Sequence, residues 1–168
     1  IRVQNTNGRI ELGPSSDDQW HLRLLTRVRA NDEASAQALA ERLVHVDNDE
    51  KLLAIQAQRM FGQNASVAVE LLVPAQDYEE LSVTTTNGSI QLAEIVATNM
   101  EIKTVNGKVR AEKLQSEGLL ASSVNGSVTI DGAIERVQAR AANGRLSVAI
   151  TDVRSTELDL KSVNGSII

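Results

Sequence analysis

The sequence predicts an all-β protein, a single-stranded β-helix (solenoid) of about six coils that carries one insertion containing an α-helix. Three observations support this prediction. An Asn-Gly pair recurs at a nearly constant period, apolar residues alternate on both sides of each pair, and aromatic residues make up only 2% of the chain. A core of Val, Ile, Leu and Ala suits thin stacked layers better than a bulky globular interior.

The Asn-Gly repeat defines the coils. Successive asparagines of the main run are 19, 19, 18 and 21 residues apart, and a corner can absorb such small variations in period. We predict that each pair forms a tight corner, with positive φ at its glycine. The five predicted corners are Asn87-Gly88, Asn106-Gly107, Asn125-Gly126, Asn143-Gly144 and Asn164-Gly165.

Apolar residues flank each corner with a period of two. With the asparagine as position 0, Val83 and Ile102 occupy position −4, and Ile90 and Val109 occupy position +3. This period is typical of strands, so each coil is predicted to contain a strand, a corner and a second strand. An Asn-Gly pair between such runs usually indicates a hairpin, so a chain of hairpins or a blade array is the alternative. The fixed period favours parallel stacking.

The whole chain, residues 1–168, is predicted to be one β-helix domain. Residues 1–12 form a first coil around Asn7-Gly8, residues 13–77 an insertion, and residues 78–168 the repeat coils. Within the insertion we expect strands at 20–29, 51–57 and 65–73, and a helix at 32–45 with capping residues at its start and an apolar face. The insertion is expected to pack over an end or a flank of the solenoid.

Composition excludes several function classes. The net charge of −5 and the pI near 5.1 argue against nucleic-acid binding, which needs a basic surface. The chain contains no cysteine, so disulfides, Cys-ligated zinc and thiol nucleophiles are excluded, and we expect no cofactor. The chain begins without methionine and has no signal-like or membrane-length apolar run, so we expect it to be a piece of a longer protein.

This pattern resembles the bacterial putative-adhesin family, domains of unknown function that repeat an Asn-Gly motif along a β-helix. The resemblance extends over nearly the whole chain and rests on Asn7-Gly8, the insertion, the segment Leu71-Leu72-Val73-Pro74 and the five later corners. It implies a bacterial cell-envelope or extracellular protein with an adhesive or sensory role. It supplies no catalytic residues.

The corner asparagines are the first candidate ligand-binding row, because each carries amide donors and an acceptor. The structural interpretation is stronger. Asn tolerates corner geometry, and stacked amides can form a hydrogen-bonded ladder from coil to coil. Small residues at position −2, such as Thr104 and Ser123, fit inside a tight corner beside the amide. We therefore predict a structural role for the corner pairs.

Metal binding has little support in the sequence. His21 and His45 lie outside any cluster with ligand spacing, so we interpret them as a strand end and a helix end. The run at residues 47–50 has oxygen donors but lacks the glycine and distal glutamate of a calcium loop, so a solvated turn is the better interpretation. We predict no metal site.

A carbohydrate-active enzyme is the alternative from another class, because polysaccharide lyases and hydrolases also use β-helices. Such an enzyme needs paired carboxylates, or a bound calcium ion beside a base. The repeat region contains Asp131, Asp152 and Asp159, which do not share one repeat position. We therefore predict that the chain is not an enzyme.

Cations at outward positions beside the corners are the remaining candidate site. Positions −3, +2 and +4 of the main run hold no acidic residue, and coils stack about 4.8 Å apart, so these cations are predicted to form one stripe. The stripe suits an anionic polymer or membrane headgroups. The alternative is a solvated face that discourages aggregation. Its members are Lys103, Lys108, Arg110, Arg140, Arg145 and Lys161.

Together these observations predict a non-catalytic envelope module for binding, adhesion or sensing. A purely structural module that self-assembles is a further alternative. The sequence stops just after a corner, at Ile167 and Ile168, so we also expect either association of copies through the C-terminal coil or continuation into further coils or a cap. The pattern does not decide the handedness of the solenoid.

Overall fold

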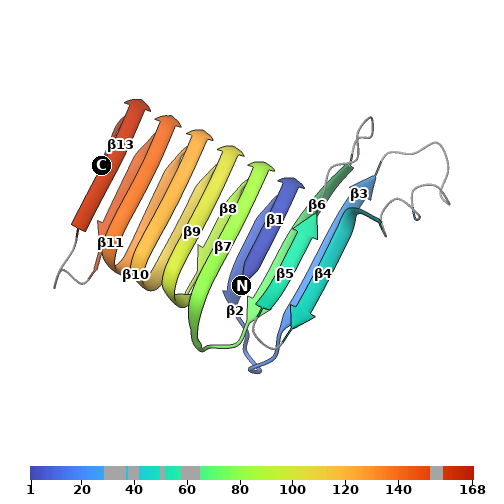
Figure 1. The fold of residues 1–168 in the computed structure, drawn as a ribbon. Coiled ribbons are helices and arrows are strands. Elements are labelled where there is room, and N and C mark those ends of the chain that lie inside the picture. Colours follow the sequence, from blue (N-terminus) through green and yellow to red (C-terminus); the bar gives the residue numbers. More distant parts are fainter. Residues whose placement is uncertain (29–36, 38–41, 50–51, 58–64, 152–156) are drawn as a thin grey trace.

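The computed structural model describes residues 1–28, 37, 42–49, 52–57, 65–151 and 157–168. All of its named elements are strands (Figure 1). The strands are β1 Arg2–Asn7, β2 Ile10–Pro14, β3 His21–Val28, β4 Val44–Asp49, β5 Leu52–Ala57, β6 Ala65–Val73, β7 Asp77–Asn87, β8 Ile90–Ala93, β9 Val96–Asn106, β10 Val109–Asn125, β11 Val128–Asn143, β12 Leu146–Ile150 and β13 Glu157–Asn164.

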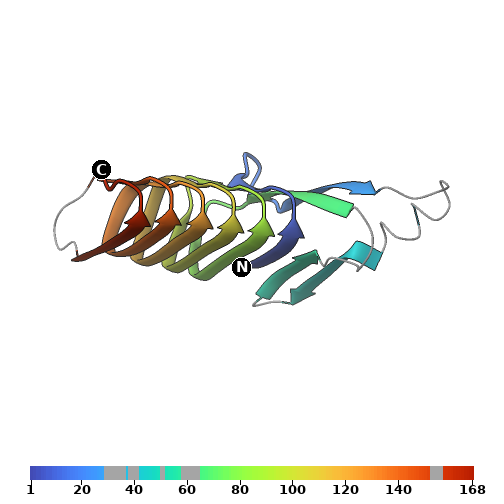
Figure 2. The same cartoon turned by 90° about the horizontal axis from the view of Figure 1, so that it is seen from above.

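The strands form two ladders, one on each side of the corners (Figure 2). The pre-corner ladder runs in the order β4-β5-β1-β7-β9-β10-β11-β13, and the post-corner ladder runs β3-β6-β2-β8-β10-β11-β12. Strands β10 and β11 are long enough to take part in both ladders. All pairings are parallel except β3 with β6 and β4 with β5, which are antiparallel. The predicted all-β solenoid is therefore confirmed.

Register follows the sequence repeat. At position −4, Val83 lies opposite Ile102, and Ile102 lies opposite Ala121 in the next strand. At position +3, Val109 pairs with both Ile90 and Val128. Equal positions therefore stack, because a shift of one residue would turn every apolar side chain to the solvent.

The solenoid has about four turns, so the prediction of six coils is wrong. Six Asn-Gly corners are present, but only the five from Asn87 to Asn164 follow one another directly, and they enclose four complete turns. After the first corner the chain leaves the repeat beyond Pro14 and returns at Asp77. The sequence count treated each corner as a coil.

The helix-containing insertion is also not confirmed. Residues 32–36 and 38–41 of the predicted helix lie outside the described residues. Val44 and His45 were expected to end the helix, but they begin strand β4, where Val46 pairs with Ile55 of β5. Tertiary strand pairing outweighs the local helical pattern here. In the part of the chain that the structure describes, no helix is long and apolar enough to cross a membrane.

The insertion extends the solenoid beyond the first corner. Strand β5 pairs with β1 in the pre-corner ladder, and β6 pairs with β2 in the post-corner ladder. The antiparallel strands β4 and β3 follow at the outer edges. As a result, the N-terminal strand β1 lies inside the array, between β5 and β7. The two ends of the pre-corner ladder are β4 and β13 (Figure 1).

The core is the thin space between the ladders. Leu81 and Val83 face Ile90 and Leu92 from opposite sides of a corner, and all four are at most 1% exposed. Burying each such side chain contributes roughly 1.5–3 kcal/mol. The register thus fixes the core, and the outward faces are left for polar side chains.

The connection between β2 and β3 provides a test of pH dependence. Asp17 Oδ1 accepts hydrogen bonds from Ser15 Oγ at 2.6 Å and Gln19 N at 3.2 Å, and it contacts His21 Nε2 at 2.7 Å. The Ser15 hydrogen bond, followed by the His21 contact, lowers the pKa of the Asp17 carboxyl to about 2. A depressed pKa stabilises the fold above the unfolded value of 3.8, and this stabilisation is lost as pH falls through about 2.

We therefore expect Asp17→Asn to lower the free energy of unfolding at pH 5, with a difference that shrinks as pH falls toward 2. Urea unfolding over a pH series measures this difference. Asp18→Asn is the matched control, because Asp18 has a φ of 57° that asparagine also tolerates. If the loss in free energy of unfolding caused by Asp17→Asn is the same at every pH of the series, Asp17 does not have the lowered pKa described here.

Candidate functional site

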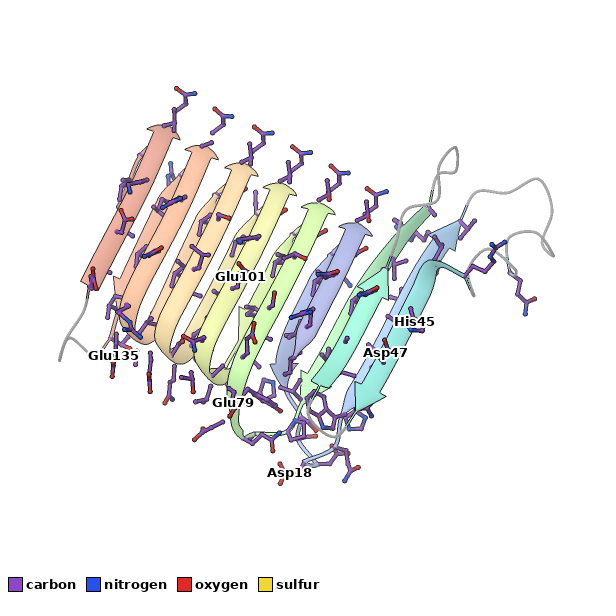
Figure 3. The ribbon with its side chains drawn as sticks, in the orientation of Figure 1. Asp18, His45, Asp47, Glu79, Glu101 and Glu135 are labelled. Atoms are coloured by element: carbon purple, nitrogen blue, oxygen red, sulfur yellow. The ribbon has the colours of Figure 1, made fainter. Side chains whose placement is uncertain are left out.

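The Asn-Gly corners form one continuous edge of the molecule, which we call the corner edge and define as positions −3 to +4 around the six corner asparagines. Side chains project in a row beyond the ends of β1, β7, β9, β10, β11 and β13 (Figure 3). Their regularity follows from the register of the two ladders. The backbone geometry at this edge therefore repeats from coil to coil, whereas the side chains at the outward positions vary.

The corner asparagines are hydrogen-bonded to one another. Each Nδ2 donates to the Oδ1 of the preceding corner at 2.8–2.9 Å, and the row ends where Asn7 Nδ2 approaches the Ala65 carbonyl oxygen at 3.4 Å. An amide has two N–H donors and two lone pairs, so each linked amide keeps one of each for solvent or a ligand. The row, the amide ladder, contains Asn7, Asn87, Asn106, Asn125, Asn143 and Asn164.

The corner glycines are required by close stacking. A Cβ added to Gly126 would meet the carbonyl oxygen of Gly107 at a distance that real Cβ atoms essentially never show. Among the described glycines only Gly8 and Gly132 have positive φ, at 123° and 157°. The expectation of positive φ at the later corner glycines is therefore wrong. The glycine is needed because backbone stacks directly on backbone.

Position −2 fills the inside of the corner. Thr104 Oγ1 donates to the Gly88 carbonyl oxygen at 3.1 Å, and Ser123 Oγ donates to that of Gly107 at 2.9 Å. Both residues are buried, at 4% and 3% exposure. These two bonds satisfy carbonyl groups of the stacked corners, so Thr104 and Ser123 have a structural role, whereas the buried hydroxyls of Thr85 and Ser162 at the same position have no partner among the described residues.

The pre-corner cations are paired with carboxylates. Lys103 forms an ion pair with Glu101, and Asp159 lies 3.1 Å from Lys161 Nζ and 3.9 Å from Arg140. In the two lysine pairs the partners are two residues apart in one strand, so they point to the same face. The hydrogen bond from Lys103 lowers the pKa of the Glu101 carboxyl and keeps it ionised. The row at position −3 is therefore largely neutralised.

The post-corner cations differ from one another. Arg110 is paired with Glu112 at 2.7 Å, whereas Lys108 and Arg145 are exposed and form no ion pair with any described residue. Arg9 occupies the same position +2 after the first corner and lies 3.3 Å from Glu11. Arg9 was not among the predicted cations, because outward positions were counted only in the five later coils. The same count from Asn7 would have found it.

The six predicted cations therefore lie in three rows, at positions −3, +2 and +4, on both sides of the amide ladder. A fourth row, at position −1, is partly apolar: Val105, Val124 and Val163 are 40%, 45% and 78% exposed. Among the described residues, Lys108 and Arg145 have no carboxylate partner. The corner edge thus offers cations, spare amide groups and small apolar side chains side by side.

A shallow groove of about 940 Å³ crosses the outer face of the pre-corner ladder, away from the corners. Its lining includes the carboxyl groups of Glu79, Glu80 and Glu101 and the guanidinium group of Arg136. Glu79 and Glu101 are labelled in Figure 3. Because its lining contains several carboxylates, this groove is the candidate site for the alternative enzyme function.

Two of the aspartates considered for catalysis, Asp131 and Asp159, lie on different strands. Asp131 lies within β11, opposite Ala149 of β12, and accepts a hydrogen bond from Lys113 N at 3.3 Å, whereas Asp159 lies on β13 among cations. Asp152 lies outside the described residues. Neither Asp131 nor Asp159 lines the groove, so its carboxylates are residues that the sequence did not single out.

The histidines lie in different strands, each beside an aspartate. His21 of β3 contacts Asp17 at 2.7 Å, and His45 of β4 contacts Asp47 at 3.1 Å. Residues 47–49 belong to β4, so the predicted solvated turn is a strand, and Glu50 lies outside the described residues. Within the described ranges no three His, Cys, Asp or Glu side chains are arranged to hold a metal ion.

Comparison with known proteins finds one similar solved structure and one matching family model. A crystal structure of a putative adhesin from Bacteroides fragilis is similar to the chain at 13% sequence identity and a TM-score of 0.43, over 98% of this chain and 89% of that one. A comparison with curated proteins finds no match. The family model for Toastrack DUF4097 matches residues 1–168. The chain therefore belongs to the Toastrack DUF4097 family, as its resemblance to domains of unknown function indicated.

Proposed function

We propose that this chain is a non-catalytic binding module of the cell envelope that holds an anionic polymer along the corner edge. One observation carries the proposal: Lys108 and Arg145 project from equal positions of a rigid repeat, exposed and without a carboxylate partner in the described part of the chain. Exposed charge on a fixed lattice suits a ligand that itself repeats.

The distribution of charge supports this proposal. The net charge is −5, yet the corner edge carries seven cations, Arg9 and the six predicted ones, and Glu11 is its one carboxylate between positions −3 and +4. The ion pairs at Arg9 and Arg110 are exposed, and exposed pairs contribute only about 0–1 kcal/mol each. A polyanion can displace such carboxylates at little cost, so it gains attraction from several coils at once.

Catalysis in the groove has weaker support. A glycosidic general acid needs a raised pKa, whereas the Lys103 hydrogen bond lowers the pKa of Glu101. These groups suit a polar surface for binding better than proton transfer to a leaving group.

Polymer binding can be tested by titrating the protein with hyaluronan at about 50 and 200 mM salt, with anionic vesicles as a separate arm. We expect Lys108→Ser with Arg145→Ser to weaken hyaluronan binding about tenfold, because neither cation has a carboxylate partner among the described residues. Lys103→Ser with Lys161→Ser is the matched control with the same change in net charge, and we expect a smaller loss.

Absence of hyaluronan binding at low salt would contradict the proposal, as would equal losses in the two double variants. Binding to vesicles alone would assign the edge to membrane headgroups in place of a polymer. Thermal unfolding of each variant shows whether the fold is kept, which we expect because all four side chains are exposed.

A further inference from the structure

We infer that position +2 of the corner edge selects a linear acidic polysaccharide that carries one anionic group per disaccharide. The inference rests on the proposed function and specifies its ligand. It starts from a row in which cations and serines alternate through the six Asn-Gly corners. The row, which we call the alternating row, is Arg9, Ser89, Lys108, Ser127, Arg145 and Ser166.

Backbone hydrogen bonds place these six residues in one straight line. The amide at position +3 of each coil donates to the carbonyl oxygen at position +2 of the next coil, always at 2.9 Å. Ile90 N, for example, donates to Lys108 O, and Val128 N donates to Arg145 O. No residue of the row is displaced by a bulge, because the one register shift in this ladder follows Ala111. The row therefore repeats with the spacing of the strands.

This spacing separates the cations by two coils. Neighbouring strands lie about 4.8 Å apart, so Arg9, Lys108 and Arg145 follow one another at intervals of roughly 10 Å. One coil is close to the length of one sugar residue in an extended chain, and two coils match a disaccharide. A nucleic-acid strand carries a charge about every 3.4 Å and does not match this interval.

The groups between the cations fit sugar hydroxyls. A serine lies between successive cations. Each serine hydroxyl can donate one hydrogen bond and accept others. Two positions away, the amide ladder presents one spare N–H and one spare lone pair per coil. Each sugar residue of a chain lying along the edge therefore meets polar groups, and every second residue meets a cation.

The decisive variant moves a charge without changing its amount. Lys108→Ser with Ser127→Lys changes the cation intervals from two and two coils to three and one, and keeps the net charge. Arg145→Ser with Ser166→Arg changes the cation intervals to two and three coils. The ligands are a hyaluronan decasaccharide, with one carboxylate per disaccharide, and an oligogalacturonate of equal length, with one carboxylate per sugar.

We expect both shifted variants to bind hyaluronan about fivefold more weakly and to bind oligogalacturonate within about twofold of the unchanged protein, because evenly spaced charge meets any cation interval. Unchanged hyaluronan affinity in both variants would overturn the inference, yet leave the proposed polymer binding in place. Equal losses for the two ligands would also overturn it. If the unchanged protein binds neither hyaluronan nor oligogalacturonate, the proposed function itself is overturned. Thermal unfolding confirms that the variants are folded.

Discussion

Gly126→Val is expected to lower the free energy of unfolding by about 3 kcal/mol, a large fraction of the roughly 5–15 kcal/mol that an ordinary domain has. Any Cβ at this position would overlap the carbonyl oxygen of Gly107 in the preceding coil. The side chain cannot rotate away, because the clash involves the Cβ itself and a backbone atom. Relief requires the two coils to separate, which breaks their hydrogen bonds and the amide contact between Asn106 and Asn125.

Ser127→Val is the control for this experiment. Ser127 follows Gly126 directly, its side chain is half-buried at an outward position, and valine is favourable in strands. We expect a change within about 1 kcal/mol. Chemical denaturation of the two variants and the unchanged protein provides the comparison. Equal losses at positions 126 and 127 would show that the coils do not stack backbone to backbone at this corner.

Ile102→Ala is the second substitution with a large expected effect, a loss of about 3 kcal/mol in the free energy of unfolding. Ile102 is fully buried between the ladders, opposite Val83 and Ala121 in the neighbouring strands. Removing its outer carbons leaves a cavity that parallel strands on both sides keep open, because their hydrogen bonds fix the spacing. The thin core has no second layer that could fill the space.

Val105→Ala is the matched control for Ile102→Ala. Val105 belongs to the same strand, β9, but is 40% exposed beside the corner. We expect a loss below about 1 kcal/mol. Urea unfolding measures both variants, and a larger loss for Val105 than for Ile102 would mean that the strand faces are assigned the wrong way round.

Much of the fold could be predicted from local patterns. The period of two fixes which side chains point inward, and the Asn-Gly spacing fixes where each strand must turn. These rules correctly placed Val83, Ile102 and Val109 in the core. The segment 65–73 was predicted as a strand and is strand β6. Stacking then requires equal positions to pair, which is the register observed.

The insertion was predicted less well, because its structure depends on distant partners. Residues 44–49 carry a local helical and polar pattern, yet they pair antiparallel with β5 at the edge of the pre-corner ladder. An edge strand is stabilised by the neighbour that it meets in space, and no short-range signal encodes that neighbour. The number of turns was overestimated for a related reason, since the path between the first two corners leaves the repeat.

The candidate site was also predicted only in part: the positions of its cations follow from the sequence, and their ion pairs do not. The outward positions of all six predicted cations could be counted from the repeat, and so could that of Arg9. Their ion pairs with carboxylates could not be predicted in this way, because an ion pair depends on which side chains share a face and reach each other. Lys103 has a carboxylate two residues away in its own strand, whereas Arg140 contacts Asp159 in the adjacent strand.

The sequence by itself determined the corners, the inward and outward faces and the alternation of cation and serine at position +2. Each of these depends on chemistry within a few residues, repeated at a fixed period. Only the tertiary structure decided that β5 and β6 flank the N-terminal strands, that glycine is needed at Gly126 for stacking, and which cations lack a described carboxylate partner. These features depend on distances between atoms from different coils, which are set when the coils pack together.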